Sequence, residues 1–162
     1  MERSSPGPLT HAERRARHKR AAGIAWKLGF VGSVEYRHVY SQTGGAQYGR
    51  ANTPKEDLLT VYAEAFERDA DPEEFSLEAM IAHECGHQIL ARHPRIAKRV
   101  AGISAASEEI LASLLGAMIC DDDADRVVLF AKATAELLDR GQSAESANRQ
   151  LQQLWEQLEA LL

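Results

Sequence analysis

The chain has 162 residues, 44% of them hydrophobic and 27% charged, which is ordinary for a soluble globular protein with one domain and a single core. No apolar run reaches the roughly 20 residues that a membrane span needs, so no membrane-spanning segment is expected. The net charge of −5 argues against a nucleic-acid-binding protein.

Charge is distributed unevenly along the chain. Residues 1–30 contain seven Lys/Arg and two Glu, whereas residues 31–162 contain twelve Lys/Arg and 22 Asp/Glu. The basic N-terminal part is either a solvated helix face or an arm that contacts an acidic partner. Cys85 and Cys120 are too few for a disulfide framework, so the cysteine content favours a cytoplasmic protein.

The N-terminal segment is predicted to contain one helix followed by a strand. Residues 1–9 are rich in Ser, Pro and Gly and are expected to be disordered. Thr10 and Glu13 have the spacing of a capping box, which predicts a helix that ends near Gly29. Side chains alternate over residues 33–41, which predicts a strand.

The segment after this strand supports two interpretations. Residues 43–54 predict a turn and a short or irregular second strand. Residues 55–70 combine a helix-start pattern with apolar residues at helical spacing, which slightly favours a helix. Residues 58–62 are also typical of a buried strand, because they include β-branched and aromatic side chains.

The chain from residue 71 onward is predicted to be helical. Four helices are expected, in chain order: one that starts at Asp71-Pro72 or at Ser76 and ends before Pro94, one capped by Ser104 or Ser107 that runs to about Cys120, one capped within residues 121–125 that ends at Gly141, and one that opens at Ser143.

The last helix carries an apolar stripe at helical spacing: Leu151, Leu154, Leu158 and Leu161, with Trp155 beside it. This stripe either packs within the same domain or binds a partner, including a second copy of the chain. We expect a C-terminal helical hairpin over about residues 122–162, within a single domain that covers residues 10–162.

The sequence HECGH carries the main functional signal. His83 and His87 are four residues apart, so on a helix their directions differ by only about 40° and both can bind one ion. Glu84 is close enough to reach a water on that ion without binding the ion itself. This is the pattern of zinc hydrolases in which two histidines bind zinc and the glutamate is the general base. Cys85 points away from the histidines and is expected to be a small core residue.

A third protein ligand has to follow this motif. His93 has the outer spacing of the metzincin signature, but Leu90 stands where that signature needs a glycine to turn the chain back. Glu108 and Glu109 begin the next predicted helix, which leaves room for the chain to finish one helix and return across it.

Glu109 is preferred over Glu108 because small residues surround it on its helix: Ala105, Ala106, Ala112, Ser113 and Gly116. Ala82 and Gly86 offer a matching small strip on the motif helix, so the two helices can approach closely. Glu108 instead shares its side with two leucines.

The segments SLEAMIAHECGHQIL (76–90) and SEEILASLLGAMI (107–119) resemble the ImmA/IrrE family of small bacterial metallopeptidases. Members typically show an AHELGH helix and then a Glu-x-x-Ala helix, which residues 109–112 match. The resemblance covers residues 24 to about 120. It implies a minimal gluzincin-type zincin fold, α+β and mostly helical, with a small antiparallel sheet ahead of the active-site helix. That sheet would make residues 58–66 a strand.

Two hypotheses about function follow. In the first, the chain is a zinc-dependent metalloendopeptidase: His83, His87 and Glu109 hold Zn²⁺, and Glu84 activates water. The resemblance implies a protein or peptide substrate, such as a separate transcriptional regulator. In the second, the chain is a catalytically inactive, zinc-stabilised interaction module that binds a partner or oligomerises through its C-terminal leucine stripe.

Overall fold

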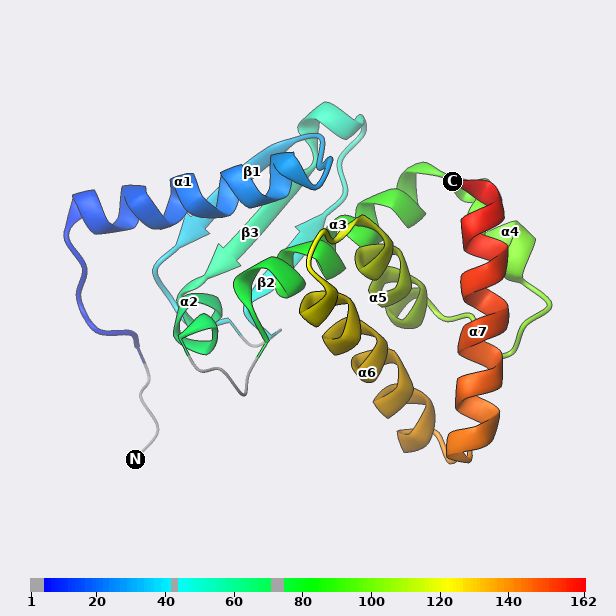
Figure 1. The fold of residues 1–162 in the computed structure, drawn as a ribbon. Coiled ribbons are helices and arrows are strands. Elements are labelled where there is room, and N and C mark those ends of the chain that lie inside the picture. Colours follow the sequence, from blue (N-terminus) through cyan, green and yellow to red (C-terminus); the bar gives the residue numbers. More distant parts are fainter. Residues whose placement is uncertain (1–4, 42–43, 71–74) are drawn as a thin grey trace.

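The computed structural model describes residues 5–41, 44–70 and 75–162, and it confirms an α+β fold that is mostly helical (Figure 1). The described residues form seven α-helices, three strands and one short 3₁₀ helix, in this order: α1 His11–Lys27, β1 Ser33–Arg37, β2 Ala46–Gly49, η1 Pro54–Glu56, β3 Leu58–Tyr62, α2 Ala63–Asp69, α3 Leu77–Arg92, α4 Pro94–Val100, α5 Glu108–Ile119, α6 Asp123–Asp139 and α7 Ala144–Leu161. None of the helices in these ranges combines the length and apolar character needed to cross a bilayer.

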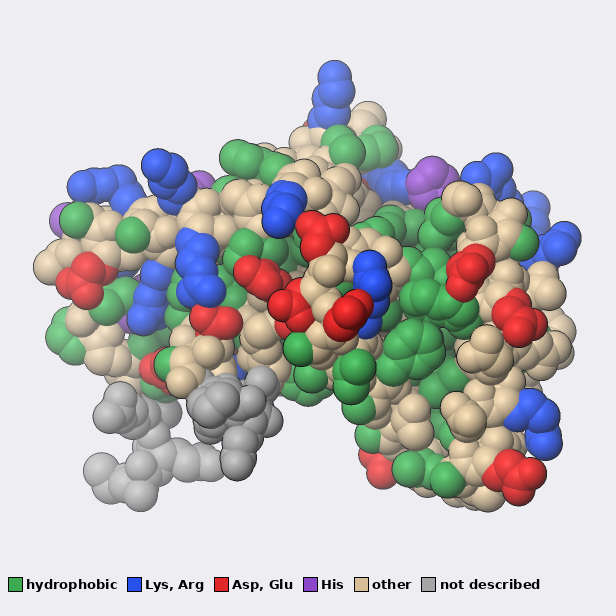
Figure 2. All heavy atoms as spheres, in the orientation of Figure 1, with side chains coloured by type: hydrophobic (Ala, Val, Ile, Leu, Met, Phe, Trp, Pro, Cys, Tyr) green, Lys and Arg blue, Asp and Glu red, His purple; other side chains and the backbone are tan. Residues whose placement is uncertain are grey.

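The start of α1 confirms the predicted capping box. The Thr10 hydroxyl accepts a hydrogen bond from the backbone N–H of Glu13, and the Glu13 carboxylate accepts one from the backbone N–H of Thr10. Most basic side chains of α1 are exposed, as a solvated helix face requires (Figure 2). Of the segment expected to be disordered, residues 1–4 lie outside the described residues, and the carbonyl of Gly7 contacts Nε2 of His38 at 2.6 Å.

The sheet lies ahead of the motif helix, as expected, but it is mixed rather than antiparallel. Its strand order is β1-β3-β2, with β2 antiparallel and β1 parallel to β3. β3 lies between the two earlier strands and forms hydrogen bonds with both of them. Residues 58–62 form β3, so the slight preference for a helix there is wrong, and the strand that the resemblance implies is confirmed over these residues. Residues 63–66, which were expected to continue that strand, instead begin α2.

Side-chain caps show which of the candidate residues begin the helices after residue 74. Ser76 caps α3, while Asp71 and Pro72 lie outside the described residues. Ser107 rather than Ser104 caps α5. α3 ends before Pro94, as predicted, but Pro94 then starts the additional helix α4 in its favoured first position.

Two clusters of buried side chains lie on opposite sides of α3, which runs through the middle of the molecule (Figure 1). The first joins α1 and α3 to the sheet, through Ala25, Val34, Leu59 and Ile81 among others. The second joins α4, α5, α6 and α7. It includes Leu151, Leu154 and Leu158, with Leu161 and Trp155 packed against it, so the C-terminal stripe packs within the chain.

Candidate metal centre

The site lies where α3 and α5 cross at very short distance. A Cβ atom on Gly86 of α3 would overlap the backbone carbonyl of Ala112 on α5. A Cβ atom on Gly116 of α5 would lie 2.7 Å from the carbonyl oxygen of Ala82 on α3. The small residues on both helices therefore allow backbone to touch backbone, and this contact brings the first turn of α5 beside the two histidines.

Three side chains with metal-binding atoms meet at this crossing. Nε2 of His83 lies 3.2 Å from Nε2 of His87 and 3.0 Å from Oε2 of Glu109. Nε2 of His87 lies 3.1 Å from Oε1 of Glu109. In a tetrahedral zinc site, ligand atoms about 2.05 Å from the metal are separated by roughly 3.3 Å. The spacing of the three donors therefore fits one such ion.

The outer nitrogens of both imidazoles have hydrogen-bond partners. Nδ1 of His83 lies 2.9 Å from the buried hydroxyl of Ser113, and Nδ1 of His87 lies 3.3 Å from Oε1 of Glu108. A carboxylate only accepts hydrogen bonds, so Nδ1 of His87 carries the proton and its Nε2 presents a lone pair. When Nδ1 of His83 donates to Ser113 in the same way, two lone pairs and a carboxylate face one another. Such a set of acceptors calls for a cation between them.

The electrostatic surroundings favour the protonation states that a metal needs. Burial, followed by the positive charges of Lys132 and His87, holds the pKa of His83 well below its usual range, so the imidazole is neutral. Partial burial acts to raise the pKa of Glu109, but the electrostatic influence of His87 and His83, with the hydrogen bond from His83, outweighs burial and lowers that pKa. A neutral imidazole and an ionised carboxylate are the forms that bind metal ions.

Glu84 lies beside the three donors without joining them. Its Oε2 accepts a hydrogen bond of 3.0 Å from the backbone N–H of Tyr48 on β2. Burial raises the pKa of Glu84 to about 7, against smaller lowering effects from His87 and the Tyr48 N–H. Glu84 and the three donors line an open hollow of about 300 Å³, which is also lined by Gln47, Tyr48 and Lys132.

A buried polar cluster behind β2 fixes the position of Tyr48. Asp57 is fully buried and accepts hydrogen bonds from Tyr48 Oη at 2.7 Å and from the backbone N–H of Ala51 at 2.7 Å. Gln88 Nε2 and Arg92 Nε, both on α3, donate to the same carboxylate at 2.9 and 3.1 Å. This cluster therefore ties β2 to the helix that carries the motif.

The other residues that the sequence analysis considered do not join the three convergent side chains. His93 is an exposed residue at the end of α3 and is not among the three convergent donors. Glu108 contacts the outer nitrogen of His87 instead of pointing at the centre. Cys85 is buried in the core of α1, α3 and the sheet, as expected, and burial raises the pKa of its thiol to about 12.

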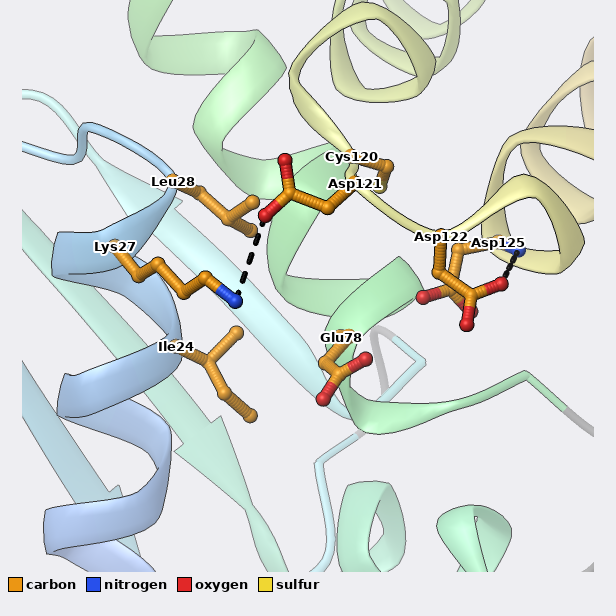
Figure 3. Close-up of a pocket in the computed structure, with 8 residues that line it drawn as sticks. All are labelled: Ile24, Lys27, Leu28, Glu78, Cys120, Asp121, Asp122 and Asp125. Carbon is orange, nitrogen blue, oxygen red and sulfur yellow. Dashed lines mark hydrogen bonds and ion pairs between the residues drawn. The ribbon is translucent and has the colours of Figure 1, made fainter.

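A second hollow, of about 340 Å³, lies between α1 and the junction of α5 and α6 (Figure 3). Its acidic side chains serve the local structure. Asp125 accepts a hydrogen bond from the Ser76 hydroxyl at 2.6 Å, and Asp122 caps α6. Lys27 and Asp121 form an exposed ion pair of 3.4 Å. In contrast to the metal centre, this hollow contains no set of imidazole and carboxylate donors that converge on one point.

Comparison with family models, with curated proteins and with solved structures gives no match.

Proposed function

We propose that the chain is a zinc-dependent metalloendopeptidase, in which His83, His87 and Glu109 hold the metal. The observation that carries the proposal is the convergence of two imidazole Nε2 atoms and a carboxylate, all within 4.8 Å of one another, beside a further glutamate at an open hollow. Zinc, when bound at such a site, supplies a Lewis acid and lowers the pKa of a water to about 7.

Glu84 is suited to the proton transfers of peptide hydrolysis. Its carboxylate is held by the Tyr48 N–H on one oxygen, next to the donors but outside their group. In this position it can accept a proton from the attacking water and donate it to the amine that leaves. A site with a purely structural metal would need a fourth protein ligand and would have no use for a free glutamate.

The alternative of an inactive interaction module has lost its main support, since most of the leucine stripe on α7 is buried against α4, α5 and α6. The substrate is a protein or peptide in this proposal. Cleavage of a separate transcriptional regulator stays a prediction that rests on the family resemblance.

Glu84→Gln tests the proposed chemistry. The amide keeps the shape of the side chain but cannot accept a proton, so zinc content should stay at one per chain while peptide cleavage falls by about 100-fold or more. The assay combines elemental analysis with mass spectrometry of a proteome-derived peptide library incubated with the zinc-loaded chain.

Glu78→Gln provides the matched control, because Glu78 is an exposed glutamate in the first turn of the same helix. This variant should cleave the library like the wild type. Undiminished cleavage by Glu84→Gln, or a zinc-loaded wild type that cleaves nothing in the library, would contradict the proposal.

A further inference from the structure

We propose that Lys132 of α6 and Arg68 of α2 form a carboxylate-binding subsite beside the metal centre, which holds an acidic group of the peptide to be cleaved. The group is either an Asp or Glu side chain or the free carboxylate at the end of the substrate. This subsite rests on the proposed peptidase function. It would give the enzyme a preference for acidic substrates, which the metal ligands alone would not impose.

The subsite is a cavity of about 160 Å³ that adjoins the hollow of the metal centre. The two spaces share Ala46, His83, Glu84 and Lys132 as lining residues. The remaining walls of the cavity are mainly apolar and include Phe75, Ala79, Met80 and Leu129, with Arg68 as the second cation. Because His83 and Glu84 line both spaces, a group in this cavity belongs to a substrate residue near the cleaved bond.

Neither cation has an anionic partner among the residues that the structure describes. The Nζ atom of Lys132 lies 5.8 Å from the centroid of the Phe75 ring, and within those ranges it forms no ion pair. Arg68 donates from Nη1 to the carbonyl of Gly44 at 3.0 Å, an uncharged acceptor. The chain has 24 Asp/Glu against 19 Lys/Arg, so cations without an ion pair in the described part of the chain are not a consequence of excess basic residues.

Lys132 lies beside the proposed metal ligands but is not one of them. Lys132 lines both the cavity and the hollow beside His83, Glu84 and Glu109, so its ammonium group lies next to the place where a substrate would bind. A cation does not favour the binding of a metal dication nearby. The apolar walls weaken solvent screening, so a carboxylate placed between Lys132 and Arg68 would interact more strongly than one at the surface.

Three probes with one skeleton test the subsite on the zinc-loaded full chain. Each carries an N-hydroxymalonamoyl group, whose hydroxamate binds zinc, joined to glutamic acid α-amide, to glutamine with a free α-carboxylate, or to glutamine α-amide. The first two probes are isomers with one carboxylate in different places, and the third is neutral. Calorimetry gives the affinity of each probe, and the tighter of the two acidic probes identifies the source of the carboxylate.

We expect at least one acidic probe to bind about tenfold or more tightly than the neutral probe. Lys132→Met should remove this advantage and Arg68→Met should reduce it, each measured as the ratio of acidic-probe to neutral-probe affinity within the same variant. Lys19→Met, which removes an exposed charge on α1, is the control for net charge and should keep the advantage. Equal affinities of the three probes, or an advantage that survives Lys132→Met, would overturn the subsite.

Zinc content is measured before the titrations, which separates the two proposals. A chain that takes up no zinc contradicts the proposed function. The subsite is then tested on the metal-free chain with the monoamide of glutarate, which has one carboxylate, against the neutral diamide: tighter binding of the monoamide that is lost in Lys132→Met supports the subsite, and equal binding overturns it.

Discussion

Single residues behind the candidate metal centre hold it in shape as much as His83, His87 and Glu109 do. The Asp57 carboxylate holds Tyr48 on one side and Arg92 of α3 on the other, and the backbone of Tyr48 in turn holds Glu84. Burial acts to raise the pKa of Asp57, but hydrogen bonds from Arg92, Ala51, Gln88 and Tyr48 outweigh burial and hold that pKa well below its usual range.

Asp57→Asn should reveal this effect through the pH dependence of stability. A carboxylate whose pKa is lowered by folding stabilises the native state above its unfolded pKa of about 3.9, and this contribution is lost as the pH falls below that value. We expect the variant to be less stable than the wild type by about 3 kcal/mol at pH 7, and the difference to narrow at about pH 3. Urea unfolding at both pH values measures the free energies.

Asp121→Asn serves as the control, since Asp121 forms an exposed ion pair with Lys27. Such pairs contribute about 0–1 kcal/mol, so this variant should be close to the wild type at both pH values. A deficit of Asp57→Asn that is the same at both pH values would argue against a role for the ionised carboxylate.

At the scale of helices, the crossing of α3 and α5 is the feature that assembles the three donors. Gly116→Ala would place a methyl group 2.7 Å from the carbonyl oxygen of Ala82 and 3.1 Å from the backbone nitrogen of His83. Both neighbours are backbone atoms, so the helices have to separate. We expect a loss of about 1–3 kcal/mol in unfolding free energy and a weaker affinity for zinc, measured by denaturation and by chelator competition.

Gly23→Ala is the matched substitution on α1. Gly23 is exposed within the helix, and a Cβ atom there would meet nothing within 4 Å. Removal of a helical glycine should stabilise the chain by about 0.5–1 kcal/mol and leave zinc affinity unchanged. A Gly116→Ala variant that behaves like Gly23→Ala would show that the close crossing is not needed.

The elements that the sequence predicts well are those with a local signal. The cap and the small residues of α5 predicted a helix that brings Glu109 near the histidines, because a helix cap and a small face depend on residues close in the chain. β3 and α4 were missed or misjudged for the opposite reason. β3 is a strand because it lies between β1 and β2, and this pairing involves residues far apart in sequence.

At the scale of the whole molecule, the candidate metal centre lies where the two buried clusters meet. α3 provides both histidines and belongs to the first cluster through Ile81 and Cys85. α5 provides Glu109 and belongs to the second cluster through Ile110 and its neighbours. The site therefore forms only when the first cluster, around the sheet, and the second cluster, around α4 to α7, pack against each other at α3.

The same arrangement explains which parts of the site the sequence did not reveal. His83, Glu84 and His87 lie within one motif, whose spacing carries the signal. Lys132 comes from α6 and meets them only because α6 packs near α3 and α5, so no spacing in the sequence identifies it. The hydrogen bond between Ser113 and His83 likewise appears only when the helices cross.

Zinc affinity, measured ligand by ligand through competition with a chelator at fixed pH, tests the central claim most directly. We expect one zinc per wild-type chain and a loss of more than about 100-fold in Glu109→Ala, which removes a ligand. Glu108→Ala should lose about tenfold, because it removes only the partner of the outer nitrogen of His87, and His93→Ala should lose nothing. A wild type without zinc, or an unchanged affinity in Glu109→Ala, would contradict the metal centre described above.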